Sequence, residues 1–381
     1  MNKLTYITYQ SFPAETANSL QTISNIKYFV KNNISISLYF PLRESKSNSD
    51  LRILQEKYKI SENFMVHGIK HYLPFGRVKI FKKTIFHFSH IIWSGWVVYR
   101  YFKNRNDNDI FFTRSEWVLY FLSKKECTVV FECHQTSKSR NFILKKLALK
   151  KNILFIFLNN ALENFYKIPK ERSLVLHNGV DLEFFNPIQD EKENKIIFVG
   201  SLSRFGKSRN LKFLIECYEK SEILKKFSLS IVGGPEDEAL ELSKDIEKRG
   251  LSDIISVLGQ LSRKESLKEV TKSKIGILIN SSDNNHSYLY TSPLKYFEYL
   301  YGGLNIVAID FPAHRELPMF ERINYFEENN IDDFIVAIEN SLKIPPNLKQ
   351  DYKSISLDTR VKKIIRFIEE ARPEGLEPPT L

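Results

Sequence analysis

The stretch SPLKYFEYLYGGLNIVAI, residues 292–309, joins a helix to an apolar strand through a double-glycine turn. We predict that Ser292 is the N-cap and that the helix starts at Pro293, whose missing N–H would have no acceptor in a first turn. The segment LNIVAI is short, apolar and β-branched, as in a buried strand. A helix that leads directly into such a strand is the repeating unit of an α/β sheet.

The start of the same helix is a generic anion site. The amides of Leu294 and Lys295 point out of the positive end of the helix, where a phosphate could bind. Glu298 follows one turn after Leu294 and lies on the same side, where its carboxylate could accept hydrogen bonds from ligand hydroxyls. Taken alone, the pattern also fits an ordinary capped surface helix.

Strand-like and helical segments alternate along the whole chain. The strand-like segments are KLTYITY, ISISLYF, DIFFT, TVVFE, ILFIF and SLVLH before residue 177, and KIIFV, SLSIV, IISVL, IGILI and LNIVAI after residue 195. This alternation predicts parallel sheets in βα units. The two series predict an α/β protein with two doubly wound, Rossmann-like domains that face a central cleft.

The segment NPIQDEKENK, residues 186–195, is rich in charge and contains a proline, so it reads as the linker between the domains. We assign residues 1–185 to an N-terminal domain and residues 186–355 to a C-terminal domain. Residues 356–372 hold a final amphipathic helix, and residues 373–381, with three prolines and no periodicity, are predicted to be disordered.

Composition limits the possible partners. With 381 residues, the chain is longer than one usual core. A formal charge of +11 favours a negatively charged partner, which could be nucleic acid, an anionic membrane surface or a phosphate-bearing substrate. Cys127, Cys133 and Cys217 are odd in number and lack metal-ligand spacing, which favours a reducing compartment. The apolar run at the N-terminus is too short for a signal-peptide core.

The most apolar region, residues 85–105, contains two His, two Ser and two Arg, and we do not expect it to span a membrane. It is either a buried helix of the first domain or a helix that dips into the bilayer interface through Trp93 and Trp96. The basic residues just before it are Arg77, Lys79, Lys82 and Lys83.

Three turns in the second half of the chain follow strand-like segments. The first, after IIFVG at residues 196–200, leads into Arg204, Lys207 and Arg209, which could neutralise a diphosphate or be a solvated basic loop. The second is the double glycine of LSIVGGPEDE, and the third is the glycine of IISVLGQLS.

The order of these motifs, HNGVD, FVGSL with a following Lys, IVGGP, LGQLS and SPLKYFEYL, resembles the retaining, nucleotide-sugar-dependent glycosyltransferases of family 4, which have the GT-B fold. The resemblance extends from about residue 170 to residue 317. It is looser before that, where FPAETANSLQT and VFECHQTSKSR look like first-domain loops of the same family.

The resemblance implies specific roles. Glu298 matches the acid that holds the ribose hydroxyls of the donor nucleotide, and Leu294 and Lys295 match the amides at its phosphates. Lys207, with Arg204 or Arg209 in an ambiguous register, matches the cations on the diphosphate, and His134 matches the catalytic-site histidine near the donor sugar. The other donor-binding positions are Ser201, Tyr290 and Ser292.

Two departures from the family pattern are visible. The first of the family's paired acids, E-x7-E, is replaced here by Tyr290, and the loop SFPAETANS lacks the glycines that many members have.

The sequence offers one possible metal motif. A D-x-D pair, Asp107 and Asp109, precedes a strand and is more typical of a solvated turn than of a metal site. We therefore expect no metal and no cofactor, with fixed cations and a helix terminus stabilising the leaving diphosphate.

The resemblance implies a cytoplasmic retaining hexosyltransferase, either free in the cytoplasm or peripheral at the inner face of the membrane. It would move a sugar from a nucleoside-diphosphate sugar to a glycan or lipid-linked acceptor in bacterial cell-surface polysaccharide synthesis. Three alternatives stay open: a GT-B epimerase, which needs first-domain carboxylates that we cannot place; a basic nucleic-acid-binding protein without a recognised motif; and a transferase-like protein without activity. No nucleic-acid partner is expected.

Overall fold

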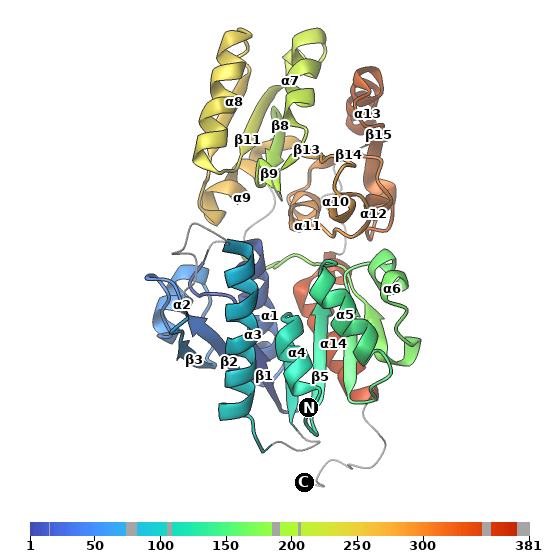
Figure 1. The fold of residues 1–381 in the computed structure, drawn as a ribbon. Helices are drawn as coiled ribbons and strands as arrows, with labels where there is room; N and C mark the ends of the chain where they lie inside the picture. The colour runs from blue at the N-terminus through green and yellow to red at the C-terminus, as the bar shows by residue number, and fades with distance from the viewer. Residues whose placement is uncertain are drawn as a thin grey trace. The chain divides into compact units, whose positions relative to one another are not determined.

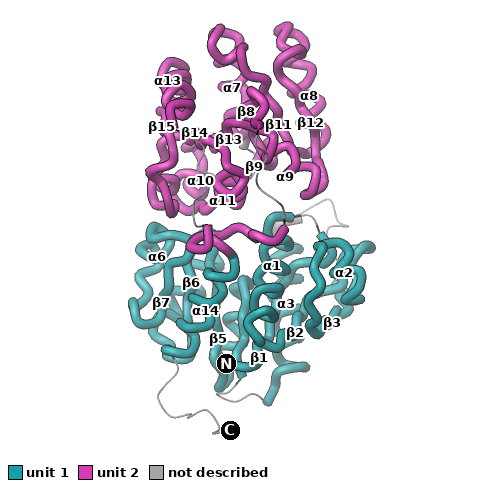
Figure 2. The backbone as a smooth tube through the Cα atoms, turned by 180° about the vertical axis from the view of Figure 1, so that it is seen from behind, with its two compact units in different colours: residues 1–176, 357–381 teal, residues 177–356 magenta. Residues whose placement is uncertain are grey.

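The computed structural model describes residues 1–14, 16–73, 82–104, 109–184, 191–204, 207–344 and 352–371. The chain forms two compact units, one of residues 1–176 with 357–381 and one of residues 177–356 (Figure 2). Each unit contains one large parallel sheet covered by helices (Figure 1). The α/β class and the two Rossmann-like domains predicted from the sequence are confirmed.

The sheet of unit 1 has the strand order β3-β2-β1-β4-β5-β6-β7, and every neighbouring pair is parallel. The order reverses between β1 and β4, which is the position in an open α/β sheet where ligands bind beyond the carboxyl ends of the strands. The strands are β1 Lys3–Ile7, β2 Ser35–Leu42, β3 Met65–Lys70, β4 Ile110–Thr113, β5 Thr128–Cys133, β6 Ile153–Phe157 and β7 Ser173–Val175.

The helices of unit 1 connect these strands. Helices α3, α4, α5 and α6 pack in sequence order, and α1 packs against α14 (Figure 1). The helices are α1 Ala17–Lys31, α2 Leu51–Tyr58, α3 Lys82–Tyr101, α4 Glu116–Leu122, α5 Lys138–Leu147, α6 Asn160–Tyr166 and α14 Leu357–Glu370, with a 3-10 turn at Lys170–Arg172.

Side-chain caps decide where the helices that follow β4, β5 and β6 begin. Ser115, Ser137 and Asn159 each accept a hydrogen bond from the amide three residues further on. Each cap satisfies an amide that has no acceptor within the helix. The polar residue after each apolar strand therefore fixes the turn from strand to helix.

The sheet of unit 2 has the order β12-β11-β8-β13-β14-β15 and is also parallel throughout. Beside it lies a short antiparallel pair, β9 and β10. The strands are β8 Glu193–Val199, β9 Ser203–Arg204, β10 Lys207–Ser208, β11 Ser228–Val232, β12 Ile255–Gly259, β13 Ser273–Leu278, β14 Asn305–Ile309 and β15 Ile323–Phe326.

The helices of unit 2 complete its βα units. They are α7 Leu211–Lys220, α8 Glu236–Lys248, α9 Arg263–Lys272, α10 Asn285–Leu289, α11 Leu294–Tyr301, α12 Pro312–Arg315 and α13 Ile331–Lys343, with 3-10 turns at Leu224–Lys226, Phe320–Arg322 and Tyr352–Ile355. A capping box between Ser262 and Glu265 starts α9, so Arg263 is its first residue.

The compact units divide the chain at positions other than the predicted ones. The sequence placed a boundary at 185/186, but the structure assigns residues 177–184 to unit 2, where the Val180 amide donates to the Ile355 carbonyl at 3.0 Å. The last three residues of the predicted linker, 193–195, belong to strand β8, which begins at Glu193. Linker residues 186–190 and the tail predicted for residues 373–381 lie outside the described residues.

All eleven strand-like segments named from the sequence are strands in the structure. The sequence did not indicate β3, β15 or the β9–β10 pair. Strand β3 at one edge of the sheet reads MVHGIK, with two polar residues and a glycine, and β15 at an edge of the other sheet spans four residues. Edge strands are buried less completely and therefore carry weaker apolar patterns.

The apolar region at residues 85–105 forms most of α3. Trp93 is 2% exposed and belongs to the core, whereas Trp96 is 38% exposed. The burial of Trp93 fits the interpretation as a buried helix of the first domain, and contact of the exposed face with a bilayer stays a prediction. Over the described residues, no helix combines the length and the apolarity needed to cross a bilayer.

Helix α14 completes the core of unit 1, although it follows the whole of unit 2 in sequence. Val361, Ile364 and Ile368 are fully buried in the same cluster as strands β1 and β2 and helix α1. We expect Ile364→Ala to lower the free energy of unfolding of unit 1 by about 2–5 kcal/mol, because it leaves a cavity in a filled core.

Tryptophan fluorescence during urea denaturation measures this change, since Trp93, Trp96 and Trp117 all belong to unit 1. The matched control is Arg366→Ala on the same helix, whose side chain is exposed and pairs with Glu370. Equal midpoints for the two variants would show that unit 1 is stable without α14.

Candidate functional site

The loops after β8, β11 and β12 pack backbone to backbone. The Gly200 amide donates to the Val232 carbonyl at 2.9 Å, and the Gly233 amide donates to the Gly259 carbonyl at 2.8 Å. Gly233 has φ +153°, and a Cβ there would lie 1.8 Å from the Gly200 carbonyl oxygen. Only glycine fits this contact. The glycine turns found in the sequence therefore bring three strand ends together.

Helix α11 is held against this edge by Tyr299. Its ring lies over Gly276 of β13, where a Cβ would come within 2.4 Å of the ring. Its hydroxyl accepts a hydrogen bond of 2.9 Å from the amide of Val199, the last residue of β8. One turn earlier, the Lys295 ammonium lies 3.9 Å from the centroid of the Phe198 ring. These contacts place the first turn of α11 beside the loop after β8.

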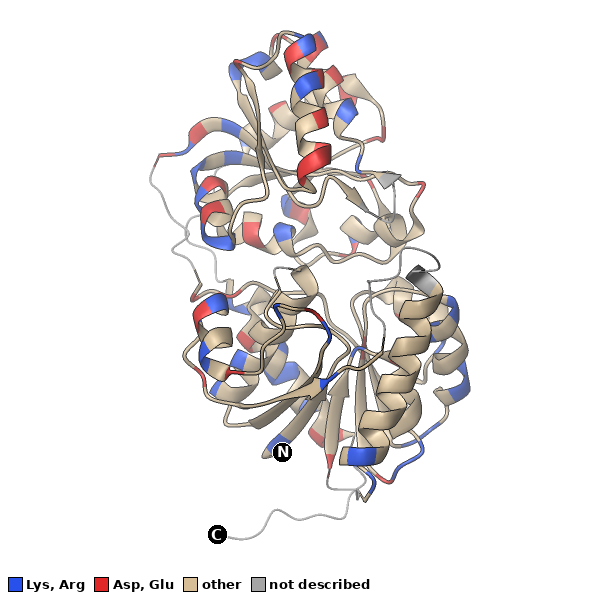
Figure 3. Ribbon diagram, turned by 60° about the vertical axis from the view of Figure 1, so that its left-hand side comes forward, with Lys and Arg blue, Asp and Glu red and all other residues tan. Residues whose placement is uncertain are grey.

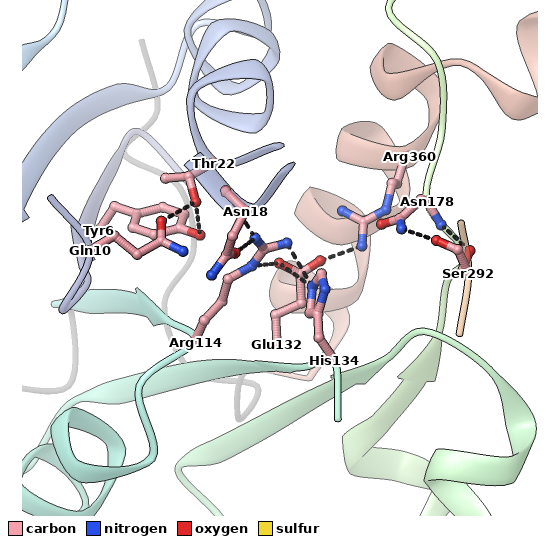
Figure 4. Close-up of polar contacts among 10 residues, drawn as sticks. All are labelled: Tyr6, Gln10, Asn18, Thr22, Arg114, Glu132, His134, Asn178, Ser292 and Arg360. Atoms are coloured by element: carbon pink, nitrogen blue, oxygen red, sulfur yellow. Dashed lines mark hydrogen bonds and ion pairs between the residues drawn. The ribbon is translucent and has the colours of Figure 1, made fainter. Parts of the chain in front are cut away.

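The predicted cap of α11 is wrong. Pro293 occupies the N-cap position, and it makes no side-chain cap hydrogen bond. The Ser292 hydroxyl instead accepts the Asn178 amide at 3.0 Å, while the Asn178 side chain donates to the Ser292 carbonyl (Figure 4). Ser292 therefore ties α11 to the chain entering unit 2, a contact between residues 114 positions apart.

Glu298 lies on α11 with its carboxylate mostly buried, 3.2 Å from the guanidinium of Arg263. Burial raises the pKa of Glu298 above its ordinary value, and the Arg263 charge opposes that rise. Arg263 in turn stacks on Phe184, 4.7 Å from the ring centroid. Sequence reasoning missed Arg263, although it follows directly after the LGQLS motif.

Of the three cations predicted at a diphosphate, Arg204 ends β9, Lys207 begins β10, and Arg209 directly follows β10. Residues Arg204 and Lys207 are opposite each other in the β9–β10 pair, but their side chains lie outside the described part of the structure. The Arg209 amide donates to the Leu202 carbonyl at 3.1 Å, and the Ser201 hydroxyl donates to the Ser203 carbonyl. The assignment of Arg204, Lys207 and Arg209 to a diphosphate, and of Ser201 to donor binding, stays a prediction.

Tyr290 closes helix α10, with its amide donating to the His286 carbonyl at 3.0 Å. Its role at a donor sugar stays a prediction.

The D-x-D pair is only partly visible in the structure. Asp107 lies outside the described residues, and Asp109 directly precedes β4. Among the residues that are described, no group of three or more His, Cys, Asp and Glu side chains is placed to hold a metal ion. Cys127, Cys133 and Cys217 are buried and none of them forms a disulfide.

In unit 1, His134 follows β5 and belongs to a network around the buried Glu132 (Figure 4). Arg114 Nε donates to Glu132 Oε2 at 2.7 Å, and Arg360 of α14 donates to Oε1. Burial alone would raise the pKa of Glu132, but Arg114 and Arg360 hold it well below its ordinary value. Arg114 also bonds to Asn18 at the start of α1.

The network determines the tautomer of His134. Arg114 Nη2 lies 2.6 Å from His134 Nε2, whereas the Glu132 carboxylate oxygen lies 3.4 Å away. A guanidinium can only donate, so Nε2 must accept and the proton must be on Nδ1. Burial and Arg114 together lower the pKa of His134 to about 4. His134 is therefore a neutral side chain whose Nδ1–H can donate to a ligand.

Two arginines around one glutamate leave this network with a net positive charge beside His134. Glu132 is two residues before His134 in VFECH, so a sequence pattern could have indicated it. Arg360 is 228 positions from Glu132, and nothing in the sequence links the two.

Comparison with known proteins supports the resemblance seen in the motifs. Residues 180–356 match the family model described as glycosyl transferases group 1, and this segment is almost the whole of unit 2. Among curated proteins, none matches the chain significantly.

Similar solved structures show that the chain has the GT-B fold. A glycosyltransferase from Rickettsia africae has a TM-score of 0.67 at 15% identity, covering 98% of this chain and 100% of that one. Anabaena Alr3699/HepE, in complex with UDP and glucose, has a TM-score of 0.65 at 14% identity, covering 97% and 100%. The lipopolysaccharide outer core galactosyltransferase WaaB has a TM-score of 0.59 at 14% identity, covering 97% and 98%.

We expect His134 to stay neutral through physiological pH, because its folded pKa of about 4 lies below the ordinary value. Nitrogen NMR of labelled protein should show an Nδ1–H tautomer down to about pH 5. Between the unfolded and folded pKa values only the unfolded chain binds the proton, so this residue makes folding less favourable as the pH falls through that window.

Arg114→Met provides the matched comparison. Without the guanidinium, the Nε2 position loses its donor, and the pKa of His134 should rise. Titration of His134 near its ordinary value in the unchanged protein would overturn the assigned tautomer and the network that imposes it.

Proposed function

We propose that the protein is a glycosyltransferase that moves a hexose-like sugar from a nucleoside diphosphate to an acceptor. The observation that carries the proposal is the arrangement at the start of α11. The Lys295 ammonium in the first turn of α11 lies beside the glycine-built loop at the carboxyl end of β8, and Glu298, one turn along the same helix, pairs with Arg263 at the start of α9. This edge of a parallel sheet is where α/β proteins bind nucleotides. The family match over residues 180–356 supports the same role.

The donor would meet two kinds of group in unit 2. Its diphosphate would accept hydrogen bonds from the first turn of α11, at Leu294 and Lys295, with the Lys295 ammonium and the basic β9–β10 loop adding positive charge. Its ribose hydroxyls would donate to Glu298, one turn along the same helix. Anabaena Alr3699/HepE, which shares the fold, was solved with UDP and glucose.

Glu298 would gain hydrogen-bond partners when a donor binds, without losing Arg263. Its carboxylate is held by Arg263 at 3.2 Å, and a carboxylate has enough lone pairs to accept two hydroxyls and keep one guanidinium. Arg263 would therefore keep the acid ionised, which strengthens each hydrogen bond that it accepts. In unit 1, the Nδ1–H of His134 would donate to an oxygen of the donor sugar.

The finer assignments rest on the sequence resemblance. We propose a retaining transferase of family 4 that needs no metal or cofactor, because fixed cations and the α11 terminus can stabilise a leaving diphosphate. The acceptor would be a glycan or a lipid-linked molecule in the synthesis of a cell-surface polysaccharide. The enzyme would work in the cytoplasm, at the inner face of the membrane, without a nucleic-acid partner.

A transferase-like protein without activity is the second candidate. Tyr290 supports it, because a carboxylate occupies the matching position in many members of the family that this chain resembles. Such a protein would bind the nucleotide and fail to transfer the sugar, so binding and transfer must be measured separately.

Glu298→Gln keeps the side-chain size but removes the charge that strengthens the two hydroxyl hydrogen bonds. We expect nucleoside diphosphates to bind at least about tenfold more weakly to this variant. Calorimetric titration with a panel of nucleoside diphosphates measures the effect, and circular dichroism checks the fold. Glu241→Gln, an exposed change on α8, is the matched control. Unchanged affinity for every nucleotide in Glu298→Gln would remove this residue from the donor site.

Arg263→Gln should make nucleotide binding depend on pH. Burial raises the pKa of Glu298 and Arg263 opposes the rise, so the variant has a still higher Glu298 pKa. As the pH falls, its carboxylate should take up a proton earlier and lose affinity sooner than in the unchanged protein. Titrations between about pH 8 and pH 5 measure the difference. Parallel pH profiles for both proteins would show that Arg263 does not control the charge of Glu298.

A further inference from the structure

Helix α3 presents a row of apolar side chains to solvent, although other apolar residues of the same helix are buried. Its outward residues Phe88, Ile92, Trp96 and Tyr99 are 61, 53, 38 and 65% exposed. Their spacing of four, four and three positions puts them in one row along the helix. We call this row the α3 stripe. Patches of this kind on a soluble surface mark contact sites for proteins or membranes.

Packing on the inner side keeps the stripe outside. His90 Nε2 lies 2.6 Å from the Ser115 hydroxyl, and the His90 ring stacks on Tyr9 with centroids 4.2 Å apart. Trp93 and Val97 on the same inner side are at most 2% exposed. Rotating α3 to bury the stripe would expose this apolar core and break the His90 contacts. The outward position of the four residues is therefore imposed by the fold.

Basic charge is found on α3 itself and on α5, which packs on α4, the helix next to α3. Within the bounds of α3, α4 and α5, the sequence contains one acidic residue, Glu116, which is buried and paired with Arg140 at 3.1 Å. The exposed charges on these helices are basic, as at Arg100, Lys145 and Lys146. In Figure 3, the part of α3 that is not grey is mostly tan, with blue at its C-terminal end and no red. An anionic surface complements this face.

We propose that the α3 stripe docks on the interfacial layer of an anionic lipid bilayer. The aromatic and aliphatic side chains would enter the headgroup region, where Trp and Tyr are favoured. Arg100, Lys145 and Lys146 would contact lipid phosphates, each adding attraction that salt screens. The inference deepens the proposed function, because a lipid-linked acceptor would be presented at this surface, but the docking itself requires no donor.

Charge also argues against a second copy of the chain as the occupant. Helix α3 begins with Lys82 and Lys83 in sequence and ends near Arg100. Two stripes facing each other, parallel or antiparallel, would bring basic ends together, which is unfavourable. An anionic bilayer meets both ends with the opposite charge.

The test uses the full chain and vesicles of phosphatidylcholine with or without phosphatidylglycerol, in the absence of donor and acceptor. We expect sedimentation with anionic vesicles that decreases as salt is raised. The double variant Ile92→Ser/Trp96→Ser should bind at least about tenfold more weakly, because it removes apolar area from the stripe. The matched control is Leu240→Ser/Val336→Ser, which changes two residues of unit 2 that are 57 and 49% exposed.

A second measurement locates the contact. Brominated lipid in the vesicles should quench the tryptophan fluorescence of the unchanged protein. Trp96→Phe should remove most of that quenching, since Trp93 is buried, Trp117 is partly buried on α4, and Trp96 is the tryptophan in the stripe. Lys145→Glu/Lys146→Glu should weaken binding while leaving the fluorescence of the free protein unchanged.

Three outcomes would overturn the proposal. The first is equal vesicle binding by the folded stripe variant and the control. The second is vesicle binding that does not depend on lipid charge. The third is that the unchanged protein is a dimer and the stripe variant a monomer. Nucleotide titration of the stripe variant separates this test from the proposed function. Lost vesicle binding with normal nucleotide affinity concerns the α3 stripe, whereas lost nucleotide affinity in Glu298→Gln concerns the donor site.

Discussion

In both large sheets every strand runs parallel to its neighbours, and the rest of the structure depends on that constraint. Parallel strands need a crossover after each strand, and the crossover helices bury both faces of the sheet. The carboxyl ends of all strands in a sheet then lie at one edge, where the residues of the following turns are the ones placed to contact a ligand. In unit 2 the turns at Gly200 and Gly233 approach so closely that a single Cβ would not fit. Helix α11 can therefore place its first turn beside the end of β8.

Buried charge is handled differently in the two units. In unit 1, Glu132 has two arginine partners, which keep it ionised and leave His134 neutral. Among the described residues of unit 2, the Glu298 carboxylate pairs with Arg263 alone, and its pKa stays raised. Glu132 is thus fully engaged by protein groups, whereas Glu298 keeps capacity to accept further hydrogen bonds. This difference fits a structural role for the first acid and a ligand-binding role for the second.

Helix α3 shows that an apolar sequence does not identify which face of a helix is buried. Its hydrophobic residues occur all round, and specific polar contacts of His90 decide the rotation of the helix. The unit that contains α3 also depends on α14, which adds three fully buried aliphatic residues from the far end of the chain. Unit 1 is therefore completed only after unit 2 has been synthesised, while unit 2 is continuous in sequence.

The sequence by itself determined the α/β class, eleven strands and the position of the helix that carries Glu298, because these follow from local periodicity and turn chemistry. It also indicated His134 and the glycine turns through short motifs. Only the tertiary structure decided the partners: Arg263 for Glu298, Arg360 for Glu132, and Asn178 for Ser292, which had been expected to cap α11. It also decided the unit boundary near residue 176 and the outward face of α3. Pairings across 35 to 228 positions depend on how strands and helices pack in space, which local patterns of residues do not encode.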